Sequence, residues 1–209
     1  MKKLLLGVCL LLLIGIGYSF YCITPFPQTD KIELNYPDSF IIDDDNIFET
    51  QVINECSAFS SAYIMRHFGE DKTGLKLYEE FNYKLPFSGY VLPKGILDYF
   101  KDSFYQVTMY TGTLETLKTQ LTKGTPIIVL VGSGLNWQHY MTVVGYDSLA
   151  NEIYFFDSLR DEDENNNLPG NRTLSIDYFL RPEPTKTIIG VPLVSCVFNV
   201  SSVPVYMVT

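Results

Sequence analysis

The sequence predicts a single α+β domain in which N-terminal helices pack on a mostly antiparallel sheet. Apolar residues recur at near-helical spacing from Ala58 to Phe68, and Gly69 follows as a natural C-terminal stop. Two strand-like runs, His139–Tyr146 and Glu152–Phe156, are separated by a turn of hairpin length. Helical patterns come before most of the strand patterns instead of alternating with them, which favours the α+β class.

The other periodic segments complete the expected set of elements. Pro126–Gly132 is a short, wholly apolar run of the kind found at the centre of a sheet. Phe104–Tyr110 is rich in β-forming residues and predicts another strand. We expect further helices over 74–81, 93–100 and 114–123, and tail strands over 187–191, 194–200 and 203–208.

Length and composition allow one sizeable core. The 209 residues are 46% hydrophobic and 14% aromatic, and no internal repeat is present. We place the domain at residues 46–209, after a polar linker over residues 25–45 that contains some extended pieces.

The first 24 residues predict a membrane anchor or a signal peptide. Lys2 and Lys3 precede an uncharged run from Leu4 to Ile23, and 20 helical residues span the roughly 30 Å hydrocarbon layer. The two lysines favour a cytoplasmic N-terminus, with the domain outside the cell membrane as a single-pass protein. A cleaved segment would make the protein secreted, but the bulky end at Tyr18–Cys22 favours a retained helix.

Cys56 lies in the first turn of the first predicted helix of the domain. Unpaired backbone N–H groups and the helix dipole favour an anion there, and the thiolate is the nucleophilic form of cysteine. His139 begins one predicted strand and Asp157 ends the next, so antiparallel pairing brings both to the same edge, with a bulge or a longer loop absorbing the offset. A thiol, a base and a carboxylate that orients the base are the parts of nucleophilic catalysis.

The order Gln51, Cys56, His139, Asp157 resembles that of papain-like cysteine peptidases. Ser57 and Ala58 after the cysteine, and the Val-Val-Gly-Tyr-Asp run after the histidine, are similar to the bacteriocin-processing peptidase family, which removes double-glycine leader peptides. The resemblance covers roughly residues 46–160. Two departures stand out: relatives commonly carry Gly where this chain has Ser57, and the Gln-to-Cys gap is five residues where six is usual.

The resemblance implies a papain-like fold and a role for each residue. Cys56 is the expected nucleophile, His139 the general base and acid, Asp157 the orienting residue, and Gln51 a donor to the oxyanion beside the Cys56 N–H. It also implies that an amide at position 157 should be tolerated, because papain-like sites work with Asn there. The expected substrate is a peptide or protein, and the expected state a monomer.

Several alternatives remain open at this point. The same site could serve an amidase or acyl transferase on cell-wall peptides, or the domain could be an inactive peptide-binding module. A Cys56–Cys196 disulfide would exclude the enzyme, although Cys196 lies in an apolar run and is expected to pack as a small hydrophobe. His67 is too far along the helix from Cys56, about 16 Å, to be its base.

Charge and motif patterns exclude other classes of partner. The formal net charge is −9, and becomes −11 without residues 1–24, so nucleic acid is not an expected partner. No spacing suits zinc, and the acidic loop from Asp161 departs from the calcium template at its last position, Arg172. We therefore expect no metal and no cofactor.

Overall fold

The computed structural model describes residues 2–23, 28–29, 33–111, 113–132, 138–160, 165, 168–180 and 194–202. The helices in these ranges are α1 (Lys2–Ile23), α2 (Cys56–His67), α3 (Gly74–Glu80), α4 (Pro93–Phe100), α5 (Leu114–Leu121) and α6 (Ile176–Leu180). The strands are β1 (Gln28–Thr29), β2 (Ser39–Ile41), β3 (Tyr105–Thr111), β4 (Ile127–Gly132), β5 (Gln138–Asp147), β6 (Glu152–Phe156), β7 (Arg172–Ser175) and β8 (Val194–Ser202).

The described strands form one eight-stranded sheet in the order β1-β3-β8-β4-β5-β6-β7, with β2 paired to β5. Among these pairs only β1 and β3 run parallel. The α+β class with a mostly antiparallel sheet is therefore confirmed. The strand expected at 194–200 is β8, whereas those expected at 187–191 and 203–208 lie outside the described residues.

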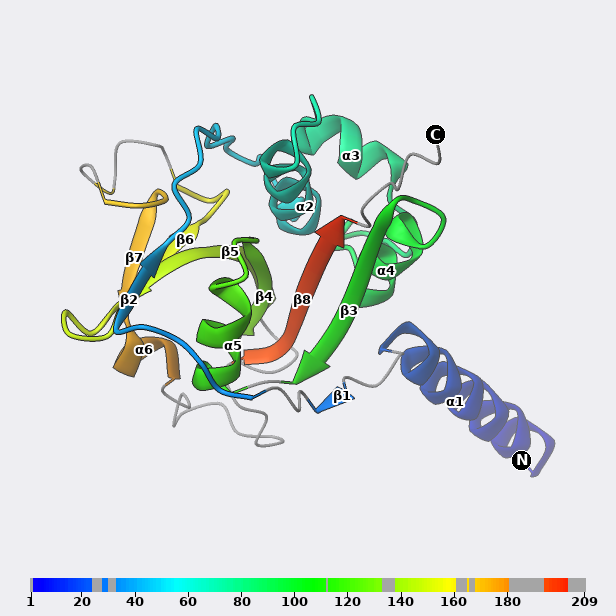
Figure 1. The fold of residues 1–209 in the computed structure, drawn as a ribbon. Coiled ribbons are helices and arrows are strands. Elements are labelled where there is room, and N and C mark those ends of the chain that lie inside the picture. Colours follow the sequence, from blue (N-terminus) through cyan, green and yellow to red (C-terminus); the bar gives the residue numbers. More distant parts are fainter. Residues whose placement is uncertain are drawn as a thin grey trace, which may run out of the picture.

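Strand β4 is buried on both faces, which explains its wholly apolar sequence. Ile128 and Leu130 pack in the core formed with α2, α3 and α4, which Figure 1 shows gathered on one side of the sheet. Ile127, Val129 and Val131 pack in a second core with α5, β5, β6 and α6. This strict alternation is what a pleated strand between two helical layers requires.

Helix α2 follows the predicted pattern closely. It begins at Cys56 and ends at His67, and Gly69 takes φ +87° just beyond it. Glycine adopts this left-handed conformation without a steric penalty, so it stops the helix. Helices α3, α4 and α5 also lie where the sequence predicts them, while β7 and α6 fall in a region for which no element was predicted.

Within the linker predicted over residues 25–45, the extended piece expected at 39–42 is strand β2, and it pairs with the domain. Ser39–Ile41 pairs antiparallel with Gly145–Asp147 of β5, and Ile42 N–H donates to Val144 O at 2.9 Å. Phe40 packs against the second core. Backbone pairing and one partly buried aromatic side chain fix a segment whose composition alone is typical of a linker.

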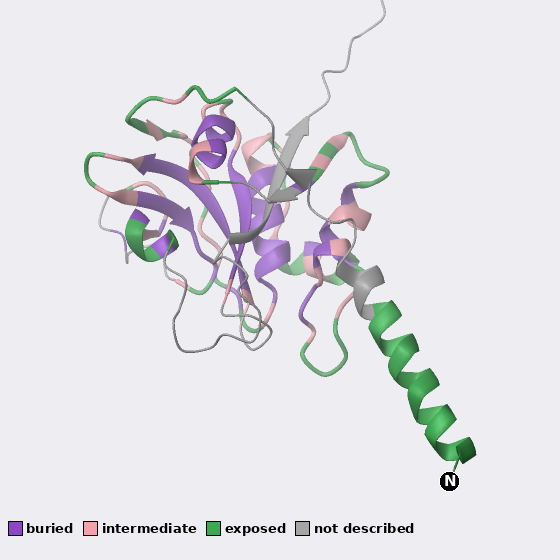
Figure 2. Ribbon diagram, turned by 90° about the horizontal axis from the view of Figure 1, so that it is seen from below, coloured by how far each residue is buried: buried purple, intermediate pink, exposed green. Residues whose placement is uncertain are grey.

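Helix α1 is continuous from Lys2 to Ile23 and projects away from the domain (Figure 1). Its side chains are exposed as far as they are described, and Figure 2 shows this contrast with the buried sheet. Within the described part of the chain, no helix is both long and apolar enough to cross a membrane. The expected membrane span therefore stays a prediction.

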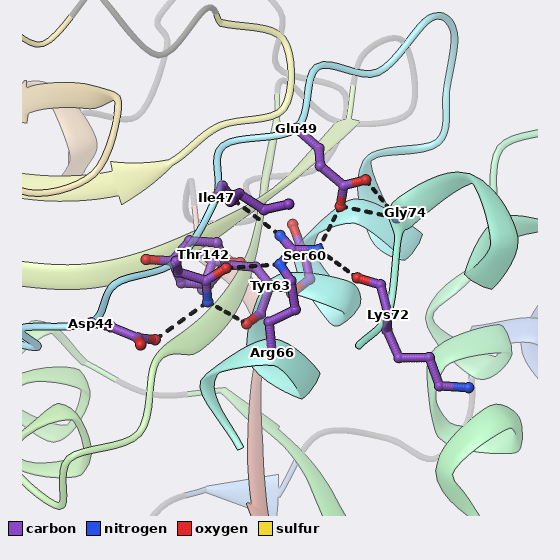
Figure 3. Close-up of polar contacts among 10 residues, drawn as sticks. Asp44, Ile47, Glu49, Ser60, Tyr63, Arg66, Lys72, Gly74 and Thr142 are labelled. Atoms are coloured by element: carbon purple, nitrogen blue, oxygen red, sulfur yellow. Dashed lines mark hydrogen bonds and ion pairs between the residues drawn. The ribbon is translucent and has the colours of Figure 1, made fainter. Parts of the chain in front are cut away.

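Arg66, near the end of α2, holds the chain segment that leads to Gln51 (Figure 3). Its guanidinium group bonds Glu49 Oε2 at 2.5 Å and donates to Asn46 Oδ1 at 2.8 Å. The same side chain donates to the backbone oxygens of Ile47 and Lys72 at 3.1 and 2.8 Å. The Glu49 carboxylate also accepts from Gly74 N at 3.0 Å, at the start of α3. One arginine thus joins α2, α3 and segment 46–49.

We expect Arg66→Met to lower the free energy of unfolding by about 3 kcal/mol, because it leaves Glu49 as a largely buried charge without its partner. Chemical denaturation monitored by circular dichroism would measure this loss. Lys101→Met, which removes an exposed cation, is the matched control and should change stability by less than about 0.5 kcal/mol. Equal effects of the two substitutions would contradict the assignment.

Candidate active site

Cys56 is the first residue of α2, and its side chain is buried, with 2% exposed. Its backbone N–H precedes the first helical hydrogen bonds, in which Ala58 and Phe59 donate to Glu55 O at 2.9 and 3.2 Å. It is therefore one of the donors that a helix start leaves without an intrahelical partner. The thiol is free, which excludes the disulfide with Cys196.

His139 and Asp157 are brought together by the pairing of β5 with β6. The ladder runs to Thr142↔Phe156 and contains a register shift between Val143 and Gly145, the bulge that the sequence spacing required. Asp157 follows β6 directly, and its Oδ1 lies 2.6 Å from His139 Nε2. Both side chains are buried, with 3% and 0% exposed.

The imidazole of His139 also has Cys56 as a hydrogen-bond partner. Burial alone would lower the pKa of His139, but the hydrogen bonds to Asp157 and Cys56 outweigh it and raise the pKa to about 9. Burial likewise favours the neutral form of Asp157, yet the hydrogen bond from His139 and further donors lower its pKa to about 2. At neutral pH the site therefore holds an imidazolium beside a carboxylate.

The hydrogen-bond geometry assigns the two ring nitrogens. Nε2 faces Asp157 at 2.6 Å, which leaves Nδ1 as the nitrogen for the Cys56 thiol. A proton can therefore pass between Cys56 and His139 while the carboxylate fixes the ring orientation. The three residues come from three elements far apart in the sequence: the start of α2, β5, and the turn after β6.

Gln51 is held against the residue that follows Asp157. Its backbone N–H donates to Ser158 O at 2.8 Å, and its side-chain Oε1 accepts from Ser158 Oγ at 2.6 Å. Both side chains are buried. Because the amide oxygen is occupied by Ser158, the opposite side of the amide presents its NH2 group, the only donor of the side chain.

The turn between Gln51 and Cys56 is closed by Glu55. Glu55 Oε2 accepts from Val52 N and Ile53 N at 3.0 and 3.4 Å, and Asn54 takes φ +54°. Asn54 Nδ2 in turn donates to Ser88 O at 2.9 Å, which ties this turn to the loop over residues 84–91. The short gap between Gln51 and Cys56 thus corresponds to a tight, internally bonded turn.

Comparison with known proteins settles the family. Residues 23–178, about three quarters of the chain, match the family described as Peptidase_C39 like. The chain belongs to the Peptidase_C39 like family. This confirms the resemblance recognised in the sequence and makes the protein a cysteine peptidase. No curated protein matches the chain.

Two solved structures share the fold of this C39-like peptidase. One, described as a C39-like peptidase from Bacillus anthracis, is 17% identical with a TM-score of 0.56, over 78% of this chain and 97% of that chain. The other is the peptidase domain of Streptococcus ComA, a bifunctional ABC transporter of a quorum-sensing pathway. It is 18% identical with a TM-score of 0.50, over 74% of this chain and 96% of that chain.

Two residues of the C39-like site escaped the sequence analysis. The Arg172 guanidinium forms an ion pair with Asp157 Oδ2. Asn171 is fully buried and bonds the backbone on both sides of Asp157: Oδ1 accepts from Asp157 N at 2.7 Å, and Nδ2 donates to Asp157 O at 2.9 Å. In the sequence Arg172 is visible only as the residue that breaks the calcium template, and no local pattern marks either residue.

The remaining candidates lie apart from the C39-like site. His67 ends α2 and its Nδ1 bonds Asp44 Oδ2 at 2.9 Å, so it has a structural partner of its own. Asp161 and Asp163 of the acidic loop lie outside the described residues, whereas Asn165 uses its side-chain oxygen to accept from Thr173 at 2.7 Å. No cluster of three metal-ligating side chains occurs in the part of the chain that the structure describes.

We expect the imidazole of His139 to titrate near pH 9, and Cys56→Ala to lower that pKa, because Cys56 contributes both a hydrogen bond and negative charge. Proton NMR of the ring signals against pH measures both, and a His67→Gln variant assigns the two histidine resonances. The raised pKa also means that stability is lost as pH rises from 6.5 through about 9, since the folded state then releases the proton that it binds more tightly. An unchanged titration in Cys56→Ala would contradict the contact.

Proposed function

We propose that the protein hydrolyses peptide bonds with Cys56 as nucleophile, His139 as general base and acid, and Asp157 as the orienting residue. The observation that carries the proposal is the buried imidazole of His139, which bonds Asp157 at 2.6 Å and Cys56 on its other side. An imidazolium beside the thiol stabilises the thiolate, and a thiolate at a helix start attacks a carbonyl carbon.

The proposed reaction follows from these positions. The Cys56 thiolate attacks the scissile carbonyl, and the protonated imidazole of His139 donates its proton to the leaving amine. A water molecule then gives a proton to His139 and attacks the thioester, which releases the acid and restores the thiolate–imidazolium pair. Asp157 remains ionised throughout and keeps the Nε2–H of the ring pointed away from the substrate.

The oxyanion of the tetrahedral intermediate requires donors beside Cys56. We assign one donor to the Cys56 backbone N–H, which the helix leaves without an intrahelical partner, and the other to the Gln51 side-chain NH2. The hydrogen bond from Ser158 to Gln51 Oε1 supports this assignment, because it orients the amide with its NH2 group free to donate. The Glu55-closed turn supports it further by fixing Gln51 relative to Cys56.

The proposed substrate is a peptide or protein with apolar side chains near the scissile bond. Val52 and Ile53, which lie between Gln51 and Cys56, are 81% and 65% exposed. Phe87 is fully exposed at φ +69°, one residue before the Ser88 carbonyl that bonds Asn54. Large apolar side chains held in solvent beside a turn of the site favour apolar contacts with a substrate.

Cys56→Ala and His139→Ala should each reduce cleavage to background, because the thiol and its base act as a unit. Gln51→Ala should lower turnover on the order of 100- to 1000-fold through loss of one oxyanion donor. Cleavage of a mixed peptide library, followed by mass spectrometry, measures these effects. Ser103→Ala, at a hydroxyl that caps a surface turn, is the control and should keep wild-type turnover. Full activity of Cys56→Ala would overturn the proposed function.

We further propose that α1 attaches the domain to the outer face of the cell membrane. The support is the uncharged run from Leu4 to Ile23 after two lysines, together with the exposure of its leucines, such as Leu4 at 74% and Leu11 at 70%. Exposed leucines on a projecting helix are costly in water and stable in hydrocarbon.

Full-length protein expressed in a bacterial cell should sediment with membranes and be released by detergent but not by high salt. A variant without residues 2–23 should be found in the soluble fraction. Protease added to intact cells should degrade the domain of the full-length protein, as the outward orientation requires. Recovery of intact full-length protein from the soluble fraction without detergent would contradict the anchor.

A further inference from the structure

Among the described residues, the recorded partners of the Asp157 carboxylate are all hydrogen-bond donors. Oδ1 accepts from His139 Nε2 at 2.6 Å and from Leu159 N at 3.0 Å. Oδ2 accepts from the Arg172 guanidinium. The carboxylate is fully buried, so water cannot replace any of these partners. Three donors converge on two oxygens, an arrangement that an ionised carboxylate satisfies completely.

The position of Arg172 is fixed by its backbone. It is the first residue of β7, and its register partner on β6 is Phe155, two residues before Asp157. Asn171, immediately before it, clamps the peptide groups of Asp157 with hydrogen bonds of 2.7 and 2.9 Å. The pair Asn171–Arg172 therefore holds both the backbone and the carboxylate of Asp157 from one strand end.

An asparagine at position 157 cannot satisfy this environment. If its oxygen faced His139 and Leu159, its NH2 group would meet the Arg172 guanidinium, and two donors would face each other in a buried site. If its oxygen faced Arg172, the NH2 group would meet the Leu159 N–H. Either orientation leaves the NH2 group of the asparagine facing a donor at a fully buried position, which costs more than the hydrogen bond itself is worth.

We propose that Arg172 is a positioning residue that makes an ionised carboxylate, and not an amide, necessary at the third position of the site. The inference rests on the proposed function for its effect on catalysis. It predicts the opposite of the expectation, drawn from papain-like enzymes, that an amide at position 157 is tolerated. Arg172 itself acts through Asp157 and not on the substrate.

The test is a double-mutant cycle of Asp157→Asn and Arg172→Gln in the full-length chain. Asp157→Asn alone should lower kcat/KM on the order of 100-fold or more, since loss of an orienting carboxylate costs about 10⁴-fold in a serine triad. In the double variant the glutamine oxygen introduced at position 172 can accept from the amide NH2 group introduced at position 157. Activity should therefore recover at least about tenfold over Asp157→Asn. The loss should fall on kcat and leave KM within about threefold, because neither residue is assigned a contact with substrate.

A second arm needs no substrate. Alkylation of Cys56 by iodoacetamide, measured against pH at the peptide level, reports the thiolate–imidazolium pair. The charged groups facing His139 are Cys56 from α2 and Asp157 after β6, and Arg172 from β7 reaches it through Asp157. Arg172→Gln removes a positive charge, so the imidazolium is stabilised and the alkaline change in rate should move to higher pH. Arg172→Lys keeps the charge and should retain the wild-type profile.

The outcomes separate clearly. Near-wild-type activity of Asp157→Asn, or a double variant no more active or stable than Asp157→Asn, would overturn the role of Arg172. If Asp157→Asn fails to fold, the thermal unfolding of the double variant is measured instead. A folded double variant supports the conflict between the amide NH2 group and Arg172, whereas a double variant that also fails to fold overturns the proposal. An unchanged alkylation profile in Arg172→Gln also counts against the proposal. The proposed function itself would fail on a different result, namely peptide cleavage by Cys56→Ala. That result would not affect the comparison of thermal stability between Asp157→Asn and the double variant.

Discussion

The buried carboxylate of Asp157 is the constraint on which the rest of the site depends. A charge with no exposed surface is tolerated only where hydrogen bonds and an opposite charge offset its lost hydration. Here the imidazole, the guanidinium and a backbone N–H supply that compensation from β5, β7 and the turn after β6. The positions of these elements are therefore tied to one side chain, and so is the orientation of the base.

The same turn also determines the other half of the site. Ser158 follows Asp157 and bonds both the backbone and the side chain of Gln51, on the turn that leads to Cys56. On the opposite side, α2 packs closely on the sheet through small residues, and Thr142 Oγ1 of β5 approaches Ser60 O at 3.5 Å. Ser57, Ser60 and Ser61 have buried hydroxyls with no partner in the described part of the chain. Leaving these hydroxyls without hydrogen bonds costs free energy, so the close packing of α2 on the sheet contributes more to stability there than hydrogen bonds of the hydroxyls would.

Local periodicity, together with the family resemblance, predicted the residues of the proposed site. Helix α2 and strands β5 and β6 each have a buried face with a regular pattern, so the positions of Cys56, His139 and Asp157 at their ends could be derived from the sequence. Arg172 and Asn171 could not, because Arg172 begins a strand of only four residues and Asn171 precedes it, so no buried face with a regular pattern marks them. Strand β2 was expected only as an extended piece of the linker, because its pairing with β5 is nonlocal and three residues are too few to show alternation.

The placement of β8 has a consequence for folding of the chain during its synthesis. In the described sheet β8 lies between β3 and β4, although it is the last of these strands to be synthesised. Until residues 194–202 have emerged, the sheet stays divided into two parts, each with an open edge, and long-range pairing of this kind is slow to form. A nascent chain that already carries Cys56 and His139 therefore lacks the completed sheet until residues 194–202 have been synthesised.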